Sequence, residues 1–143
     1  MKSKLLTLFT VCSIILIASC KKESNTSASI IGRWSGQRLH YVTTLTQSGI
    51  TDTQDTTMNC INGEYMNFAS NGTYTQGDND TSSTETGTYT YVNNTITMIS
   101  TVPDTTIFNV DLLDAHTLNL TSSYNENGPD YTFNALWTVY LTR

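Results

Sequence analysis

The thirteen residues 131–143, YTFNALWTVYLTR, carry the clearest pattern in the sequence. Large apolar side chains stand at most odd positions of this stretch, and Thr or Asn stands at most even positions. A period of two is that of a β-strand with one buried face and one solvated face. Shorter segments with the same alternation recur back to residue 30, so the stretch predicts the structure of the whole domain.

The composition also favours strands over helices. Of the 143 residues, 27 are Thr and only 13% are charged, against about 25% charged in an average soluble domain. Thr and Tyr fit a pleated strand, whereas a shortage of Lys and Glu disfavours helices. The net charge of −5 argues against nucleic acid as a partner, because phosphate binding needs clustered Lys and Arg. The length predicts one domain, since domains usually have about 100–200 residues.

Eight segments alternate strongly enough to be predicted as strands, and short turn signals such as Asn71-Gly72 and Asn93-Asn94 join several of them. The first segment changes phase, and a bulge or bend near Gly36 would explain this. Residues 47–62, 77–85 and 125–130 are predicted as loops, the first with room for a short extra strand. We therefore expect an all-β, eight-stranded, up-and-down antiparallel barrel, with an open β-sandwich as the alternative. The predicted strands are 30–46, 63–69, 73–75, 87–92, 95–99, 105–112, 117–121 and 131–141.

The N-terminal residues form a targeting signal. Lys2 and Lys4 precede an apolar run of secretory-signal length, too short to span a bilayer. The run ends in Ile17-Ala18-Ser19-Cys20, which resembles the lipobox of Gram-negative lipoproteins. This resemblance implies that residues 1–19 are a lipoprotein signal peptide, and that Cys20 becomes the lipidated first residue of the mature chain.

Residues 20–29 are small and polar after Cys20, so we predict a flexible tether between the lipid and a domain at 30–143. The expected localisation is the cell envelope, anchored to a membrane through the lipid on Cys20 and most simply to the outer membrane; the leaflet is left open. Cleavage leaves five basic residues against twelve acidic ones. The folded domain should therefore not bind anionic headgroups by itself.

Both ends of the predicted domain carry a further pattern. Gly32-x-Trp34 opens the first strand, and Arg143 closes the last. The pairing resembles the lipocalin/calycin superfamily, which implies that Gly32, Trp34 and Arg143 close the barrel base, with the guanidinium over the indole. The segments 66–74 and 87–96 are similar to the Phe-x-x-x-Gly-x-Tyr and Gly-x-Tyr patterns of bacterial lipocalin-like lipoproteins. Members of that group often carry a Cys pair, whereas Cys60 has no partner in the mature domain.

The sequence shows no constellation for catalysis or metal binding. His40 and His116 lie on different predicted elements, and no Ser or Cys has the surroundings of a nucleophile. Two His and Cys60 scattered along the chain do not make a zinc site, and the acidic loops lack the spacing of a calcium loop. We therefore predict a protein that is not an enzyme and needs no cofactor or metal.

The remaining candidate for function is the barrel interior. An apolar interior could hold a small hydrophobic ligand, although an eight-stranded barrel is also narrow enough for side chains to fill it. In the second case the protein would be an interaction module that binds a protein or glycan through loops 47–62 and 77–85. We expect a monomer in either case. The side chains predicted to line a ligand site are Met66, Phe68, Tyr74, Tyr89, Tyr91, Met98, Phe108 and Phe133.

Overall fold

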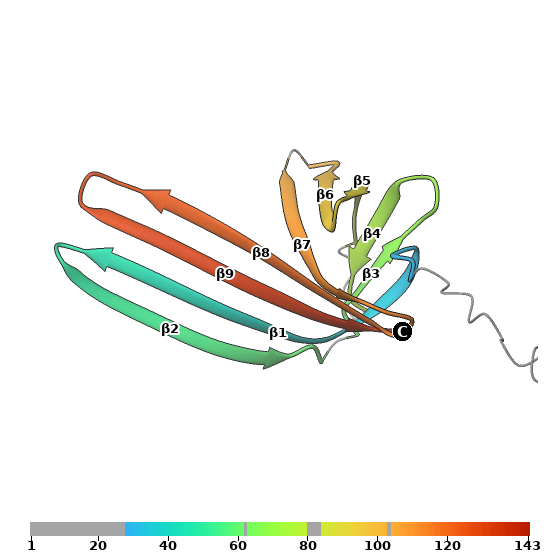
Figure 1. The fold of residues 1–143 in the computed structure, drawn as a ribbon, viewed down its shortest axis with the longest axis horizontal. Coiled ribbons are helices and arrows are strands. Elements are labelled where there is room, and N and C mark those ends of the chain that lie inside the picture. The colour runs from blue at the N-terminus through green and yellow to red at the C-terminus, as the bar shows by residue number, and fades with distance from the viewer. Residues whose placement is uncertain (1–27, 62, 80–83, 103) are drawn as a thin grey trace, which may run out of the picture.

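The computed structural model of this chain describes residues 28–61, 63–79, 84–102 and 104–143, and all of their regular structure is β-strand (Figure 1). The predictions for the signal peptide, for Cys20 and for most of the tether concern residues outside these ranges. The nine strands are β1 (Gly32–Gln47), β2 (Ile50–Asn59), β3 (Tyr65–Phe68), β4 (Thr73–Gly77), β5 (Thr84–Val92), β6 (Thr95–Ser100), β7 (Thr105–Leu113), β8 (Thr117–Asn127) and β9 (Tyr131–Thr142).

The sheet closes on itself. Its strands follow the order β2-β1-β3-β4-β5-β6-β7-β8-β9, every neighbouring pair is antiparallel, and β1 also pairs with β9. Strands β1 and β3–β9 thus form a closed eight-stranded up-and-down barrel, and β2 is an additional strand that pairs with β1. This confirms the predicted barrel and excludes the open sandwich. The phase change in β1 is a register shift between Gly36 and Arg38 opposite β9.

The two longest hairpins extend well beyond the barrel. Strand β8 pairs with β7 only as far as Thr121, whereas its pairing with β9 runs on to Asn127. Over the same stretch β1 pairs with β2 on one side and β9 on the other. Residues 41–56 and 122–137 therefore form a four-stranded projection of order β2-β1-β9-β8, which we call the arm; it points to the left in Figure 1.

The arm corrects two predictions. Residues 47–62 are not a long loop, because the ten residues of β2 form a hairpin with β1 around Ser48-Gly49. Both turn residues have positive φ, 53° and 80°, as a two-residue hairpin of type I′ requires. The predicted loop at 125–130 is also shorter, since β8 continues to Asn127. Strand β2 consists mostly of Thr and Asp, so the sequence does not predict it, because a strand exposed on both faces shows no apolar alternation.

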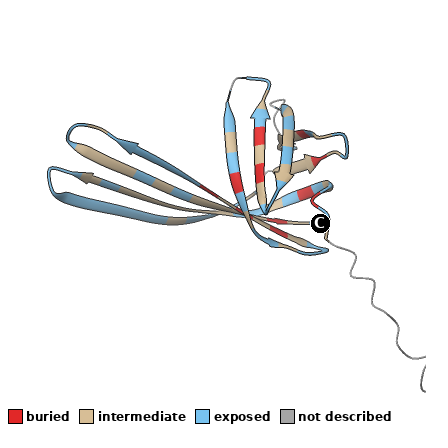
Figure 2. Ribbon diagram, turned by 45° about the horizontal axis from the view of Figure 1, so that its top comes forward, coloured by how far each residue is buried: buried red, intermediate tan, exposed pale blue. Residues whose placement is uncertain are grey.

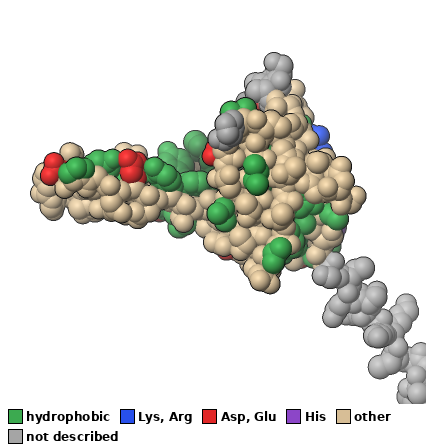
Figure 3. Space-filling model, turned by 90° about the horizontal axis from the view of Figure 1, so that it is seen from above, with side chains coloured by type: hydrophobic (Ala, Val, Ile, Leu, Met, Phe, Trp, Pro, Cys, Tyr) green, Lys and Arg blue, Asp and Glu red, His purple; other side chains and the backbone are tan. Residues whose placement is uncertain are grey.

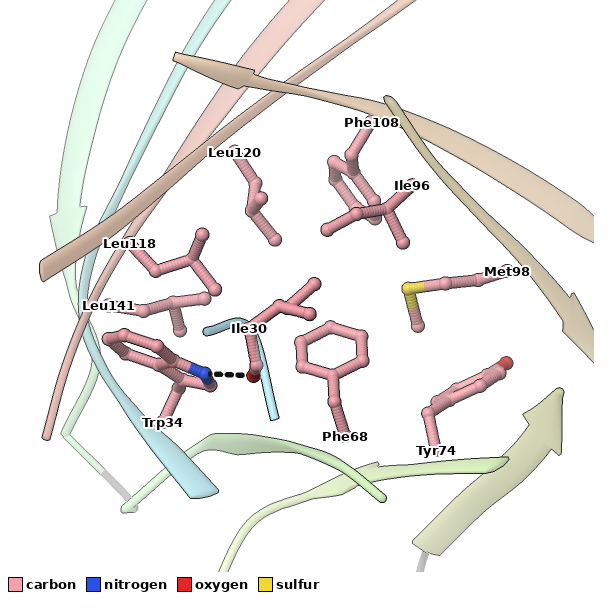
Figure 4. Packing of buried hydrophobic residues seen from close by; sticks show 10 residues of the cluster. All are labelled: Ile30, Trp34, Phe68, Tyr74, Ile96, Met98, Phe108, Leu118, Leu120 and Leu141. Atoms are coloured by element: carbon pink, nitrogen blue, oxygen red, sulfur yellow. Dashed lines mark hydrogen bonds between the residues drawn. The ribbon is translucent and has the colours of Figure 1, made fainter. Parts of the chain in front are cut away.

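The core lies inside the barrel and leaves the arm uncovered. Figure 2 shows the buried residues gathered in the barrel and at the root of the arm. Within the arm, Ser122 alone of the described residues is buried. Figure 4 shows the apolar cluster, whose side chains point toward one another inside the barrel. It consists of Ile30, Trp34, Phe68, Tyr74, Ile96, Met98, Phe108, Leu118, Leu120 and Leu141.

Candidate functional site

The closed end of the barrel is built around Trp34, which is fully buried. Its indole Nε1 donates a hydrogen bond to the Ile30 carbonyl at 2.7 Å, and the Arg143 guanidinium lies over the indole ring, 4.1 Å from its centroid. Arg143 also donates to the carbonyls of Ile31 and Ala115, at 2.9 and 3.0 Å. Three separate segments are thereby joined at the barrel base.

Gly32 makes this closure possible. Its φ of +127° lies in a region that L side chains rarely adopt, and a Cβ at this position would come within 3.2 Å of an Arg143 guanidinium nitrogen. The sequence pattern Gly32-x-Trp34 thus has a physical reason in the structure. These residues hold the fold together at this end of the barrel.

The opposite end of the barrel is open and contains a pocket with a volume of about 700 Å³. It lies between the root of the arm, the β3–β4 hairpin and the starts of β5 and β7. Apolar side chains from β3 and β9 form part of its wall, namely Met66, Val139 and Leu141. The volume falls in the range of small-molecule sites, roughly 300–1,000 Å³.

Glu85 supplies a fixed negative charge in the wall of this pocket. Its carboxylate accepts hydrogen bonds from the Tyr74 hydroxyl at 2.5 Å and from the Gln76 side-chain amide at 2.9 Å. The Ser100 hydroxyl is a third donor to the same carboxylate. Gly87 allows this arrangement, because a Cβ there would lie 2.6 Å from the Tyr74 ring. Three donors from strands β4 and β6 therefore hold the carboxylate in place.

These contacts shift the pKa values of both partners. The hydrogen bond from Tyr74 lowers the pKa of Glu85, outweighing the effect of its partial burial. Burial raises the pKa of Tyr74 to about 12, and the hydrogen bond to Glu85 adds to the increase. At neutral pH the pair is thus a carboxylate and a neutral phenol.

The rest of the pocket is also acidic. Four of the described residues that line it are Asp or Glu, and none of those lining residues is Lys or Arg. Each of the three Arg in the described part of the chain lies over an aromatic ring. Arg143 lies over Trp34, as described above. Arg33 lies 3.7 Å from the Tyr65 centroid, and Arg38 lies 4.0 Å from that of Tyr140. The pocket therefore combines apolar walls with a negative field.

Cys60 also lines the pocket and is a free thiol. Burial and the nearby charge of Glu64 raise its pKa. Because the thiolate is the nucleophile, a raised pKa makes this cysteine less reactive than an ordinary exposed one.

The residues predicted to line a ligand site are divided among three places. Phe68, Tyr74, Met98 and Phe108 are buried in the core cluster, where they fill the barrel, and Met66 lines the open pocket. Tyr89 and Tyr91 pack against the core from the wall of a shallower pocket beside Ile30.

The prediction that Phe133 lines the barrel interior is wrong. Phe133 lies on the arm, where it pairs with Leu45 across β1 and β9 and its ring centroid lies 6.4 Å from that of Tyr124. Alternation gives the face of a strand but not the point where the barrel ends along it. For the same reason Val139 is a pocket residue that was not predicted, although its odd position in the last strand places it on the apolar face. Nothing in the sequence indicated Glu85 in particular, because its donors come from other strands.

The structure also describes features that bear on other functions. His40 Nε2 lies 2.8 Å from Asp55 Oδ1 on the exposed face of β1 and β2, whereas His116 lies near the C-terminus, beside the Arg143 carbonyl. Among the described residues, no three His, Cys, Asp or Glu side chains gather in a way that could hold a metal ion. In the same part of the chain, no helix is long and apolar enough to cross a bilayer. Comparisons with protein-family models, with curated proteins and with solved structures found no match to this chain.

Proposed function

We propose that this chain is a lipid-anchored, lipocalin-like lipoprotein of the cell envelope that binds a small, mainly apolar molecule in the open end of its barrel. The observation that carries the proposal is the pocket of about 700 Å³, whose wall includes Met66, Val139 and Leu141. Apolar walls with a few fixed polar groups are typical of small-molecule sites. The lipobox-like sequence ending in Cys20 supports the anchor.

The charge of the pocket restricts the ligand further. The hydrogen bonds to Glu85 keep its carboxylate ionised, so an anionic ligand would be placed against a like charge in partly dry surroundings. We therefore propose a neutral or positively charged ligand with an apolar body. Fatty-acid anions should bind poorly. Nothing in this proposal requires chemistry on the ligand, and the raised pKa of Cys60 argues for a binding protein rather than an enzyme.

Two fluorescent probes of nearly equal shape test this proposal. N-phenyl-1-naphthylamine is neutral, whereas 8-anilinonaphthalene-1-sulfonate has the same aromatic body with a negative charge. The neutral probe should bind at one saturable site and at least tenfold more tightly than the sulfonate. Val139→Trp should fill the pocket and abolish binding, while Leu136→Trp, an exposed position on the same strand, should leave it unchanged. Equal affinities for the two probes, or unchanged binding in Val139→Trp, would refute the proposal.

The arm supports a second candidate function, that of an interaction module. Its inner face continues the apolar interior of the barrel, since Tyr41 pairs with Trp137 and Leu45 with Phe133. Leu45 and Tyr124 on this face are 40% and 49% exposed. An uncovered apolar sheet face of this kind marks an interaction site in many proteins. Figure 3 shows the arm as a narrow projection with hydrophobic and acidic side chains along it. The predicted interaction loop 47–62 is largely strand β2, the outermost strand of this arm.

A further inference from the structure

The outer edge of β2 is open along its whole length. Strand β2 ends the sheet and pairs with β1 only, among the strands that the structure describes. All of its residues except Thr56 are exposed. Proteins usually protect such an edge with Lys, Pro or a bulge. Residues 50–59 contain neither Lys nor Pro, and their register with β1 is unbroken. A ten-residue edge without a bulge is therefore available for another strand.

The register decides which backbone groups this edge offers. In an antiparallel pair, successive residues direct their N–H and C=O groups alternately toward the partner strand and away from it. The Cys60 N–H donates to the Gln37 carbonyl of β1 at 3.0 Å, so even-numbered residues face β1. The hairpin turn agrees, because the pair that closes a two-residue turn, here Gln47 and Ile50, is hydrogen-bonded. The free edge is therefore formed by the N–H and C=O groups of the odd-numbered residues.

We infer that this edge binds β2 of a second copy of the chain, antiparallel, about a two-fold axis at Gln54. Hydrogen bonds between two such edges must join odd-numbered residues to odd-numbered residues. With the axis at Gln54, Thr53 bonds to Asp55 of the second copy, and Thr51 bonds to Thr57. A C2 interface requires a surface that is complementary to itself, and the backbone of β2 meets this requirement.

The side chains of β2 are complementary in the same register. Reading outward from Gln54, the strand ITDTQDTTM has Thr53 and Asp55 first and ends in Ile50 and Met58. Ile50 and Met58, which are 75% and 47% exposed, would lie opposite each other across the two copies. The only charged side chains of the strand, Asp52 and Asp55, would each lie opposite a Thr.

The charges also select this register over its neighbour. An axis at Asp55 would place two Asp55 carboxylates directly opposite each other, and like charges in that position are destabilising. With the axis at Gln54 they are only diagonal neighbours, and each carboxylate is close to His40 of its own chain, 2.8 Å away. The charges thus disfavour an axis at Asp55, and among the possible axes only the one at Gln54 also places Ile50 opposite Met58.

The assembly would change the arm as well as the oligomeric state. A two-fold axis perpendicular to the sheet keeps the apolar faces of both arms on the same side. The two four-stranded arms would become one eight-stranded sheet, with the apolar residues Tyr41, Leu45, Phe133 and Trp137 of each copy on the same side. The polar side chains of the two β2 strands, such as Gln54 and Thr56, would lie between these two apolar patches. A dimer thus replaces the monomer expected from the sequence. This inference does not depend on the ligand pocket, which lies beyond the C-terminal end of β2, where Cys60 lines it.

Cysteine cross-linking in the full-length protein, in the membranes of the cells that produce it, tests the axis directly. Gln54 would face Gln54 of the second copy in a non-hydrogen-bonded pair, in which the Cα atoms are about 4.5 Å apart. A disulfide accepts Cα separations of about 4.4–6.8 Å. In a Cys60→Ser background, Gln54→Cys should form a covalent dimer on mild oxidation. Asp52→Cys is the matched control, because its two copies would be roughly 14 Å apart along the strands.

A proline substitution at the edge provides a second test. The Thr53 N–H points away from β1, so Thr53→Pro should spare the β1–β2 hairpin and remove a hydrogen bond between the copies. Cross-linking of Gln54→Cys should then fall to the level of Asp52→Cys, whereas Thr53→Ala should leave it unchanged. Absence of a Gln54→Cys dimer, equal cross-linking of Asp52→Cys, or cross-linking that Thr53→Pro does not reduce would each overturn the inference.

Discussion

Replacing Trp34 by Ala is the most direct test of how the barrel is closed. Trp34 has no exposed surface, and its indole N–H is the donor to the Ile30 carbonyl at 2.7 Å. Truncating a buried Trp costs about 3–5 kcal/mol. The Ile30 carbonyl would also lose its donor while Ile30 is only 5% exposed, which adds about 1 kcal/mol or more. We therefore expect the free energy of unfolding to fall by about 4–6 kcal/mol.

This loss is a large part of the total stability of a domain, which is typically about 5–15 kcal/mol. Urea denaturation followed by far-ultraviolet circular dichroism would measure it, because the slope with denaturant should stay constant while the midpoint moves. In thermal unfolding we expect a decrease of roughly 15 °C or more, at about 4 °C per kcal/mol. Leu136→Ala, at an exposed position of β9, is the control and should change stability by less than about 0.5 kcal/mol.

A double-mutant cycle separates the stack from the rest of the loss. Arg143→Ala alone should cost about 0.5–2 kcal/mol, since it removes a cation–π contact at an exposed guanidinium and two hydrogen bonds to the carbonyls of Ile31 and Ala115. In the Trp34→Ala background the same substitution should cost measurably less. A loss below about 1 kcal/mol for Trp34→Ala would show that the indole does not close the barrel. An Arg143→Ala effect that is the same in both backgrounds would refute the stack.

Gly32→Ala should destabilise the protein, because its φ of +127° is strained for any L side chain and the added methyl group would also lie only 3.2 Å from an Arg143 nitrogen; a melting temperature equal to that of the wild type would contradict this. The pKa of Tyr74 is raised to about 12, so its neutral form stabilises the fold below pH 10 and this contribution is lost between about pH 10 and 12. Tyr74→Phe should flatten the stability profile in that window, and a profile identical to the wild type would count against the Tyr74–Glu85 bond. On the acid side, the lowered pKa of Glu85 adds stability above its unfolded pKa, which is lost as the pH falls through the folded value; Glu85→Gln should remove that dependence from the unfolding curve. Cys20→Ser should release the protein from membranes on fractionation, whereas unchanged membrane association would mean that the lipobox prediction is wrong.

The sequence by itself determined the fold class and the strand faces. A period of two is set by the alternation of Cβ atoms along an extended chain, which is a local property. The strands other than β2 could be found from it, and so could the inward side of residues such as Phe68, Ile96 and Leu118. Turn chemistry at Asn71-Gly72 and Asn93-Asn94 added the hairpins, since both Asn93 and Asn94 adopt positive φ. Local signals in the sequence were therefore sufficient to predict the barrel.

Tertiary structure alone decided where the barrel ends, where it is hollow and what remains uncovered. Phe133 and Leu141 lie on the same face of β9, yet only Leu141 is buried. The reason is that β7 pairs with β8 only beside Leu141, and the part of β8 beside Phe133 extends beyond β7. The pocket beside Glu85 depends on donors from β4 and β6. Strand β2 has no apolar face from which it could be predicted. It forms because β1 continues beyond the barrel and offers a free edge for hydrogen bonding. Burial and register depend on which strands meet in space, and a period in the sequence does not specify that.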